Sequence, residues 1–263
     1  MSQSYKNKYA VILGGSAGLG LATAKKLAHE GMNIIIIHRS RRSVVAAFED
    51  AVREMEVSGC EIISYNTDAL NPKKRQETVD DILAKLGKGV IKLILHSIAR
   101  GNLKPLYDAE GGNILSNEDF KGTLDAMAVS YYDWVSAFAK AELFTPSARA
   151  IAFTSEGSSR AWPQYAAVAA AKAALESISR GIALEFAPLG ITSNCIQAGV
   201  TDTESLRLIP GSDKMKEMAV KRNPYQRLTL PNDVANAVYL LTRDEASWIN
   251  GTTIPVDGGE HIR

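Results

Sequence analysis

Cysteine is scarce in this 263-residue chain, whose two cysteines are Cys60 and Cys195. Two isolated cysteines exclude a disulfide-stabilised scaffold and a cysteine-rich metal centre, and they fit the reducing cytoplasm. Histidine is also rare, and no metal-ligand spacing is present among its four positions, which are His29, His38, His96 and His261. We therefore expect unreactive buried thiols and no bound metal.

An excess of charge is also lacking. Lys and Arg number 30 against 29 Asp and Glu, which leaves a formal net charge of +1. Total charge therefore gives no reason to expect a nucleic acid or a membrane surface as partner. No apolar run approaches the ~20 residues that span a bilayer, and the first ten residues, MSQSYKNKYA, lack a hydrophobic signal region. These absences predict a soluble cytoplasmic protein.

Linkers, repeats and low-complexity tracts are absent too, so we expect one domain over residues 1–263. Short apolar runs recur along the chain, most of them separated by stretches of helical periodicity: KYAVILGG, MNIIIIH, CEIISYN, IKLILHS, ARAIAFTS, ITSNCIQAG and TTIPVDGG. Runs that are apolar on both faces are typical of a parallel sheet covered by helices. The pattern predicts a Rossmann-type, doubly wound α/β fold of about seven parallel strands with helices on both faces.

Two segments interrupt this alternation. One runs from residue 98 to about 116, and the other from residue 199 to about 212, before a short helix that extends the segment to 222. Long loops at the carboxyl ends of parallel strands are where ligands bind in such folds. We expect substrate loops near 98–116 and 199–222.

A glycine-rich turn follows the first expected strand. Its sequence, GGSAGLG, contains Gly14, Gly18 and Gly20. Ser16, Ala17 and Leu19 lie between these glycines. Glycines let the backbone approach a pyrophosphate, which then lies on the positive end of the following helix. Because a strand precedes the turn and a helix follows it, the context indicates a dinucleotide site.

The residues at the end of the second expected strand indicate which dinucleotide is bound. An acidic residue there would bind the ribose of NAD, but this chain offers basic and hydroxyl groups instead: His38, Arg39, Ser40, Arg41 and Arg42. Such groups favour NADPH. At the end of the third strand, Asp68, next to Ala69, is expected either to cap the loop or to contact the adenine amine.

The stretch QYAAVAAAK places Tyr165 and Lys172 seven positions apart. Seven residues fall about 20° short of two helical turns, so both side chains would lie on one face of a helix. Taken alone, this pair is equally typical of an amphipathic surface.

Together, the glycine turn, Asp68, Tyr165, Lys172 and the terminal VDGG resemble the short-chain dehydrogenase/reductase superfamily over nearly the whole chain. Most members place the lysine four residues after the tyrosine. The seven-residue spacing is similar to that of the bacterial enoyl-acyl carrier protein reductases, as are HSIARGNLKPL, RAWPQY and QAGVTDT. The glycine turn, by contrast, has the ordinary form of the superfamily, and Ser155 stands where many enoyl reductases carry a second aromatic residue.

The resemblance implies a role for each site residue. Tyr165 would donate a hydrogen bond to the thioester oxygen, and Lys172 would bind the hydroxyls of the nicotinamide ribose. Thr154 and Ser155 would either donate to the substrate oxygen or satisfy the strand end. Further cofactor contacts are expected from Ser97, Ile98, Ala99, Gly199, Val200, Thr201 and Thr203.

The function that the resemblance implies is reduction of trans-2-enoyl thioesters on acyl carrier protein by NADPH, in fatty-acid elongation, by a homotetramer. The ordinary glycine turn and the pair formed by Thr154 and Ser155 also fit a carbonyl reductase of 3-oxoacyl thioesters. A third reading is an NADPH-binding sensor without turnover. Carrier docking is expected on the basic segment with Arg207, Lys214, Lys216, Lys221 and Arg222.

Overall fold

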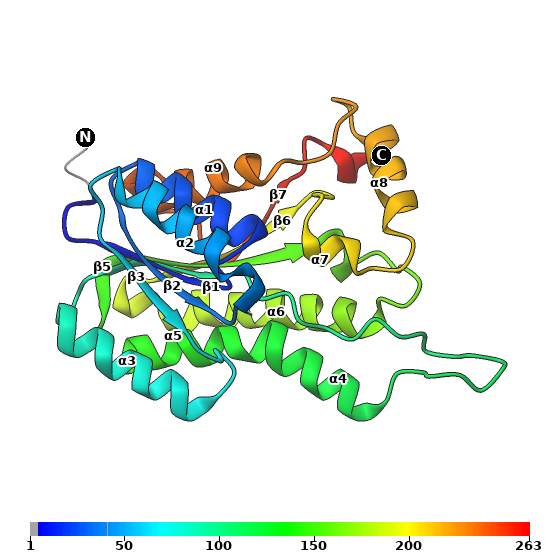
Figure 1. Cartoon of the computed structure of the whole chain (residues 1–263), viewed down its shortest axis with the longest axis horizontal. Helices are drawn as coiled ribbons and strands as arrows, with labels where there is room; N and C mark the ends of the chain where they lie inside the picture. The colour runs from blue at the N-terminus through cyan, green and yellow to red at the C-terminus, as the bar shows by residue number, and fades with distance from the viewer. Residues whose placement is uncertain (1–4, 41) are drawn as a thin grey trace.

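One parallel sheet runs through the molecule (Figure 1). The computed structural model describes residues 5–40 and 42–263, and for residues 42–44 it describes the backbone alone. Within these residues seven strands form the sheet, in the order β3-β2-β1-β4-β5-β6-β7. Their bounds are β1 Tyr9–Leu13, β2 Asn33–His38, β3 Ile62–Asn66, β4 Ile91–His96, β5 Phe144–Ser155, β6 Thr192–Ala198 and β7 Thr253–Val256. The predicted doubly wound fold is confirmed.

The central strands are buried on both faces, as the continuous apolar runs predicted. Every residue of β1 and β4 is buried. In the parallel register, Val11 pairs with Ile35 of β2 and with Ile94 of β4. The strand order reverses at β1, which lies between β2 and β4, and this reversal opens a crevice at the carboxyl ends of the strands.

Helices cover both faces of the sheet. The longer ones are α1 Gly18–His29, α2 Arg42–Glu56, α3 Pro72–Leu86, α4 Asn117–Leu124, α5 Ser130–Lys140, α6 Ala166–Glu185, α8 Ser212–Arg222 and α9 Pro231–Thr242. One core cluster joins Val11 and Ile35 to Trp134 of α5 and Leu175 of α6. The opposite cluster joins Ile12 of β1 to side chains of α1, α2 and α9. Successive residues of a strand therefore pack against opposite helix layers. Figure 1 shows these layers above and below the sheet.

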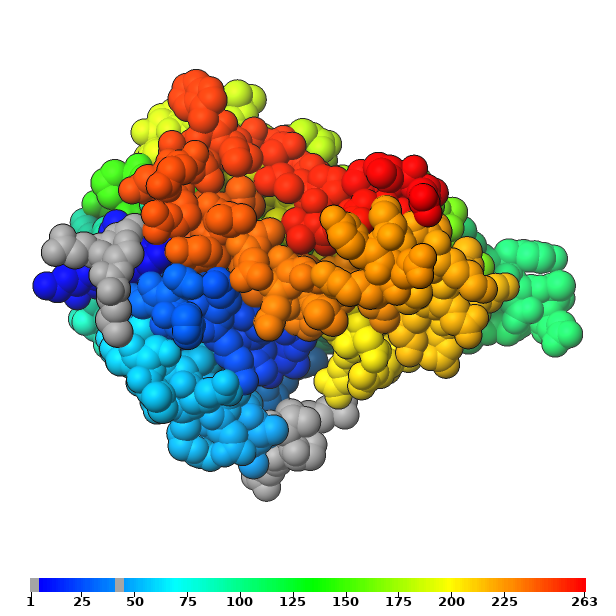
Figure 2. Space-filling model, turned by 90° about the horizontal axis from the view of Figure 1, so that it is seen from above, coloured from blue at the N-terminus to red at the C-terminus, as the bar shows by residue number. Residues whose placement is uncertain are grey.

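The first long loop is confirmed, since residues 97–116 contain neither helix nor strand. It projects from the body as an arm (green in Figure 2). Its base is held by an ion pair of 2.8 Å between Lys104 and Asp119. Asp119 also forms a capping box with Ser116 that begins α4. A π-helical turn, η2 Asp125–Val129, then joins α4 to α5.

The second long loop is less irregular than predicted. A one-turn helix, α7 Glu204–Arg207, interrupts it, because the side chain of Thr203 accepts a hydrogen bond from the amide of Leu206 and caps the turn. The chain then reverses at Gly211, which has a φ of 76°, before α8 begins. The predicted short helix is therefore eleven residues long.

None of the helices in residues 5–40 and 42–263 combines the length and the apolar character that a membrane crossing requires.

The Trp134 side chain yields a test of the core. Its indole Nε1 donates a hydrogen bond of 2.9 Å to the carbonyl oxygen of Ala69, in the loop after β3. We expect Trp134→Phe to lower the free energy of unfolding by about 2 kcal/mol, because the partly buried carbonyl of Ala69 loses its donor and buried side-chain volume is lost. Urea unfolding followed by circular dichroism measures this. Trp248→Phe is the matched control, since Trp248 is 97% exposed; equal losses in both variants would contradict the account.

Candidate active site

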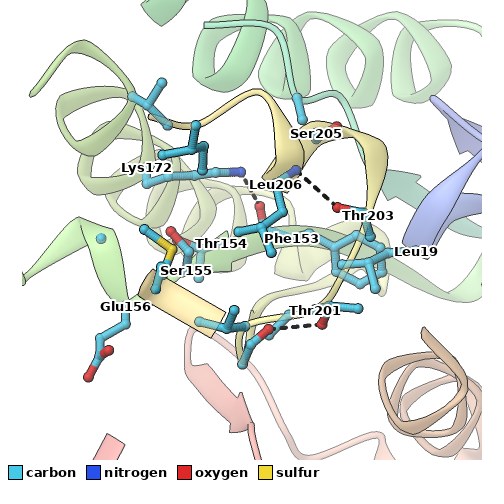
Figure 3. A pocket seen from close by; sticks show the side chains of 18 of the residues that line it. Leu19, Phe153, Thr154, Ser155, Glu156, Lys172, Thr201, Thr203, Ser205 and Leu206 are labelled. Carbon is cyan, nitrogen blue, oxygen red and sulfur yellow. Dashed lines mark hydrogen bonds between the residues drawn. The ribbon is translucent and has the colours of Figure 1, made fainter. Parts of the chain in front are cut away.

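A cavity of about 570 Å³ lies at the carboxyl ends of the strands. Backbone and small side chains of the glycine turn line one end, and the end of β5 and the start of α6 line the middle. Figure 3 shows Leu19, Lys172 and Thr203 around it. The structure thus brings together the predicted glycine turn, the predicted catalytic residues and the loop after β6.

The glycine turn has a geometry that side chains would obstruct. Gly14 and Gly18 have φ values of 82° and 54°. A Cβ on Gly14 would lie 2.5 Å from the carbonyl oxygen of Ser97, and one on Gly20 would meet the carbonyl oxygen of Gly14. Ala17, which precedes α1, makes no side-chain cap, so the first amides of the helix face the cavity uncapped. These features fit the phosphate cradle of a dinucleotide.

The basic stretch after β2 differs from the prediction in its charge. His38 is buried between Ser40 and Ser64, with ring-nitrogen contacts of 2.8 and 2.9 Å. Burial lowers the pKa of His38, so this residue provides no positive charge at neutral pH. None of the residues His38, Arg39, Ser40, Asp68 and Ala69 lines the cavity.

Asp68 and Arg39 form an ion pair of 3.4 Å across the ends of β3 and β2. The neighbouring strand therefore places a carboxylate beside this basic stretch. Asp68 also accepts a hydrogen bond of 3.0 Å from the amide of Leu70, which fulfils the capping alternative. Arg41 lies outside the described residues. Arg42 begins α2, and its side chain is likewise outside the description.

Tyr165 occupies a different position from the one predicted. It precedes α6, with φ and ψ of −114° and 2°, rather than lying inside the helix. It nevertheless lines the cavity, as does Lys172, two turns further along. Burial raises the pKa of the Tyr165 phenol, and the Ser155 hydroxyl opposes this in part. The phenol is therefore protonated at neutral pH.

Lys172 lines the cavity but is largely buried, with 8% of its surface exposed. Its Nζ donates a hydrogen bond of 2.6 Å to the carbonyl oxygen of Phe153 (Figure 3). Burial lowers the pKa of Lys172 to about 8, while Cys195 and Glu176 oppose this shift. The ammonium form still predominates at pH 7.

The two hydroxyl residues at the end of β5 have different surroundings. Thr154 donates its hydrogen bond to Glu176 Oε1 at 2.6 Å, so it satisfies the strand end and its proton is directed away from a substrate. Ser155 Oγ is buried without a hydrogen-bond partner among the described residues, and Ser155 lines the cavity. Of the two predicted donors, Ser155 is the one with a free hydroxyl. Gly157, which the sequence did not single out, leaves room for the Tyr165 ring: a Cβ there would lie 2.5 Å from it.

The loop after β6 closes over the glycine turn. Gly199, Val200, Thr201 and Thr203 all line the cavity. The amide of Val200 is occupied, because it donates to Glu260 Oε2 at 3.2 Å, so Val200 offers the cavity a packing surface. Thr201 donates to the carbonyl oxygen of Gly199.

At the end of β4, the predicted residues Ser97, Ile98 and Ala99 line the cavity. His96 lies behind them, fully buried, with Nε2 at 2.8 Å from Ser130 Oγ. Burial lowers the pKa of His96 to about 3, so its ring is neutral. No local pattern predicts this contact, because Ser130 lies 34 positions away.

An apolar wall lies beside Tyr165, and more than half of it comes from the segment after Thr203. It consists of Leu103, Met127, Trp162, Val168, Leu206, Leu208, Ile209, Met215 and Met218. A charged group borders it, in which Arg222 bridges Glu156 and Glu260 at 2.8 Å each. Periodicity predicts a buried helix face but not which cavity the side chains face.

The basic segment is largely neutralised. Arg207 pairs with Asp202 at 2.9 Å, and Lys216 pairs with Asp213 at 2.8 Å. With Arg222 also paired, Lys214 and Lys221 are the exposed cations of this segment that form no ion pair within the described residues.

The family described as Enoyl-(Acyl carrier protein) reductase matches residues 14–261. The chain belongs to this family. It is an oxidoreductase of the short-chain dehydrogenase/reductase superfamily, as the sequence motifs predicted.

Several known proteins are similar to the chain over most or all of their length. Peroxisomal 2,4-dienoyl-CoA reductase of Mus musculus is 27% identical over 255 residues, which cover 97% of this chain and 84% of that protein. A 3-oxoacyl-[acyl-carrier-protein] reductase of Staphylococcus epidermidis is 24% identical over 256 residues, covering 97% and 100%. The solved structure of a short chain dehydrogenase from Burkholderia cenocepacia in complex with NADP is 26% identical, with a TM-score of 0.80 and coverage of 97% and 98%.

Gly14 provides the test of the dinucleotide cradle. We expect Gly14→Ala to weaken binding of a nicotinamide dinucleotide at least about tenfold, because the new methyl group meets the Ser97 carbonyl and displaces the turn. Fluorescence titration measures the Kd. Gly59→Ala is the matched control: Gly59 has a φ of 77° but no atom within 4 Å of the added Cβ, so it shares the backbone strain without the collision. Unchanged affinity in Gly14→Ala would rule out this cradle.

Proposed function

We propose that this protein uses NADPH to reduce the double bond of trans-2-enoyl thioesters carried on acyl carrier protein. The observation that carries the proposal is the placement of Tyr165 before α6, two turns from Lys172, beside the apolar wall. One turn before Lys172, where most members of the superfamily have their tyrosine, Val168 lines the cavity instead. Compared with most members of the superfamily, this arrangement places the phenol further from the lysine along the cavity. The methyl groups of Val168 occupy the position one turn before Lys172.

The chemistry places negative charge on the thioester oxygen. When bound, NADPH supplies the hydride, which enters at the β-carbon and leaves an enolate. Tyr165, protonated because burial raises its pKa, donates a hydrogen bond to that oxygen, and Ser155 Oγ provides a second donor. Donors that are already in place when charge develops stabilise the transition state without reorganisation. A proton from water then adds to the α-carbon, which completes the reduction.

The shape of the cavity supports an acyl substrate. Residues of α7, α8 and the loop between them, such as Leu206, Ile209 and Met215, supply apolar surface to the same cavity as Tyr165. An acyl chain buried there would gain roughly 0.8 kcal/mol for each CH₂ removed from water. The mouse relative, whose name states reduction of a dienoyl-CoA, supports chemistry on conjugated double bonds of thioesters.

A carbonyl reductase of 3-oxoacyl thioesters is the second candidate. The free hydroxyl of Ser155 beside Tyr165 favours it, because a ketone oxygen needs two such donors. The relative from Staphylococcus epidermidis is named for that activity.

NADPH is proposed as the cofactor on the strength of Arg39 and Ser40 after β2. The relative from Burkholderia cenocepacia was solved with NADP, which supports the same choice. The Arg39 pair with Asp68 is 60% and 40% exposed, so the guanidinium can exchange the carboxylate for a 2′-phosphate at small cost. A homotetramer in the cytoplasm is proposed from the family resemblance.

Tyr165→Phe tests the role of the phenol. Loss of one donor to a developing oxyanion costs about 10²- to 10³-fold in kcat, so we expect a loss of this size in NADPH consumption with crotonyl-acyl carrier protein. Tyr132→Phe, on an exposed tyrosine of α5, is the control and should retain full activity. A Tyr165→Phe enzyme with the wild-type rate would refute this assignment.

Carrier docking through the two unpaired lysines has its own test. Replacing both Lys214 and Lys221 by Glu should raise the KM for crotonyl-acyl carrier protein several-fold and leave that for a crotonyl thioester of N-acetylcysteamine unchanged, because only the carrier is acidic. A variant with Lys73→Glu and Lys140→Glu changes the net charge equally on α3 and α5, so its KM should match the wild type. An effect of the same size in both double variants would contradict docking at α8.

A further inference from the structure

Helix α6 carries an oppositely charged pair one turn apart on the side that faces β5. Lys172 Nζ donates to the carbonyl oxygen of Phe153 at 2.6 Å, and Glu176 Oε1 accepts from Thr154 Oγ1 at 2.6 Å. Two consecutive residues of β5 are thus held by two residues of α6 that are four positions apart. The next residue of β5 is Ser155, so this clamp lies directly behind the donor side chains of the site.

The other titratable groups around Lys172 are neutral. From β4, His96 is uncharged because burial lowers its pKa to about 3. From β6, Cys195 is a neutral thiol because burial raises its pKa to about 11. Tyr165, before α6, and Tyr131 of α5 are both protonated because burial raises their pKa values.

Of the two groups that oppose the fall in the pKa of Lys172, Cys195 is a neutral thiol at pH 7, which leaves Glu176, one turn along the same helix, as the carboxylate. An opposite charge nearby favours the charged form of a lysine against the desolvation that burial imposes. Glu176 is half-buried, and its bond from Thr154 directs the carboxylate toward β5 rather than into solvent.

We propose that Glu176 is a positioning residue of the active site, which keeps Lys172 protonated in its buried position and fixes the end of β5 through Thr154. Glu176 itself does not line the cavity, so it acts through Lys172. The consequence for catalysis rests on the proposed function. The charge state of Lys172 does not, because it can be measured without substrate or cofactor.

The decisive experiment is a pH titration of Lys172 by NMR in protein labelled with ¹³C-lysine, with the Lys172 signal identified by its absence from Lys172→Arg. In the wild type we expect a midpoint near pH 8. In Glu176→Gln, whose amide oxygen still accepts from Thr154, we expect the midpoint to fall by about one pH unit. Glu185→Gln removes an exposed carboxylate from the same helix and should leave the midpoint unchanged.

A wild-type midpoint in Glu176→Gln would overturn the proposal, whatever reaction the enzyme performs. Thr154→Val separates the charge of Glu176 from its hydrogen bond, since it removes the bond from Thr154 Oγ1 and keeps the Glu176 carboxylate. Its midpoint should stay within a few tenths of the wild-type value, and a fall as large as that of Glu176→Gln would also overturn the proposal. If Glu176→Gln does not fold, Glu176→Asp takes its place. Retention of the charge should then keep the midpoint above pH 7.5, and a lower value would count against the role of charge.

If enoyl reduction is established, the alkaline limb of kcat/KM should move in parallel. We expect the limb in Glu176→Gln to shift down by the same interval as the Lys172 midpoint, with activity below pH 6.5 close to that of the wild type. A uniform loss at every pH would indicate a purely structural role.

Discussion

A lysine ammonium buried behind the edge of a parallel sheet must find acceptors and negative charge, because an unpaired buried charge is costly. Lys172 finds its acceptor in the carbonyl of Phe153, and Glu176, one turn away on α6, accepts from Thr154, the next residue of β5. These contacts hold α6 against β5. They also place Tyr165, at the start of α6, beside Ser155, at the end of β5. The hydrogen bond that satisfies the buried ammonium of Lys172 therefore helps to set the geometry of the site.

Two chemically different surfaces meet at this point. On one side, Gly14 and Gly18 open the backbone toward the uncapped amides of α1, which suits phosphate groups. On the other, α7 and α8 provide the apolar wall. Arg222, which bridges two carboxylates, fastens α8 over the cavity. A dinucleotide and an acyl chain can therefore approach each other where Tyr165 lies.

Sequence patterns predicted the features that depend on neighbouring residues in the chain. Continuous apolar runs predicted the buried strands, and the glycine turn predicted the close approach of backbone at Gly14. The start of α6 was misplaced because the spacing of Tyr165 and Lys172 does not report the backbone before the helix, where Gln164 has a φ of 61°. Contacts such as Thr154 with Glu176 and Val200 with Glu260 span 22 and 60 positions. The spacing of apolar residues along the sequence does not predict contacts between residues so far apart. The burial of His38 depends on Ser64 of the neighbouring strand in the same way.

The central claim is that the site reduces a conjugated double bond rather than a ketone. The most direct measurement gives the enzyme equal amounts of crotonyl- and acetoacetyl-acyl carrier protein with limiting NADPH, and identifies the products by mass spectrometry. The ratio of products then equals the ratio of kcat/KM values. The placement of Tyr165 predicts butyryl-acyl carrier protein as the dominant product. A predominance of 3-hydroxybutyryl-acyl carrier protein would contradict the claim and establish the protein as a carbonyl reductase.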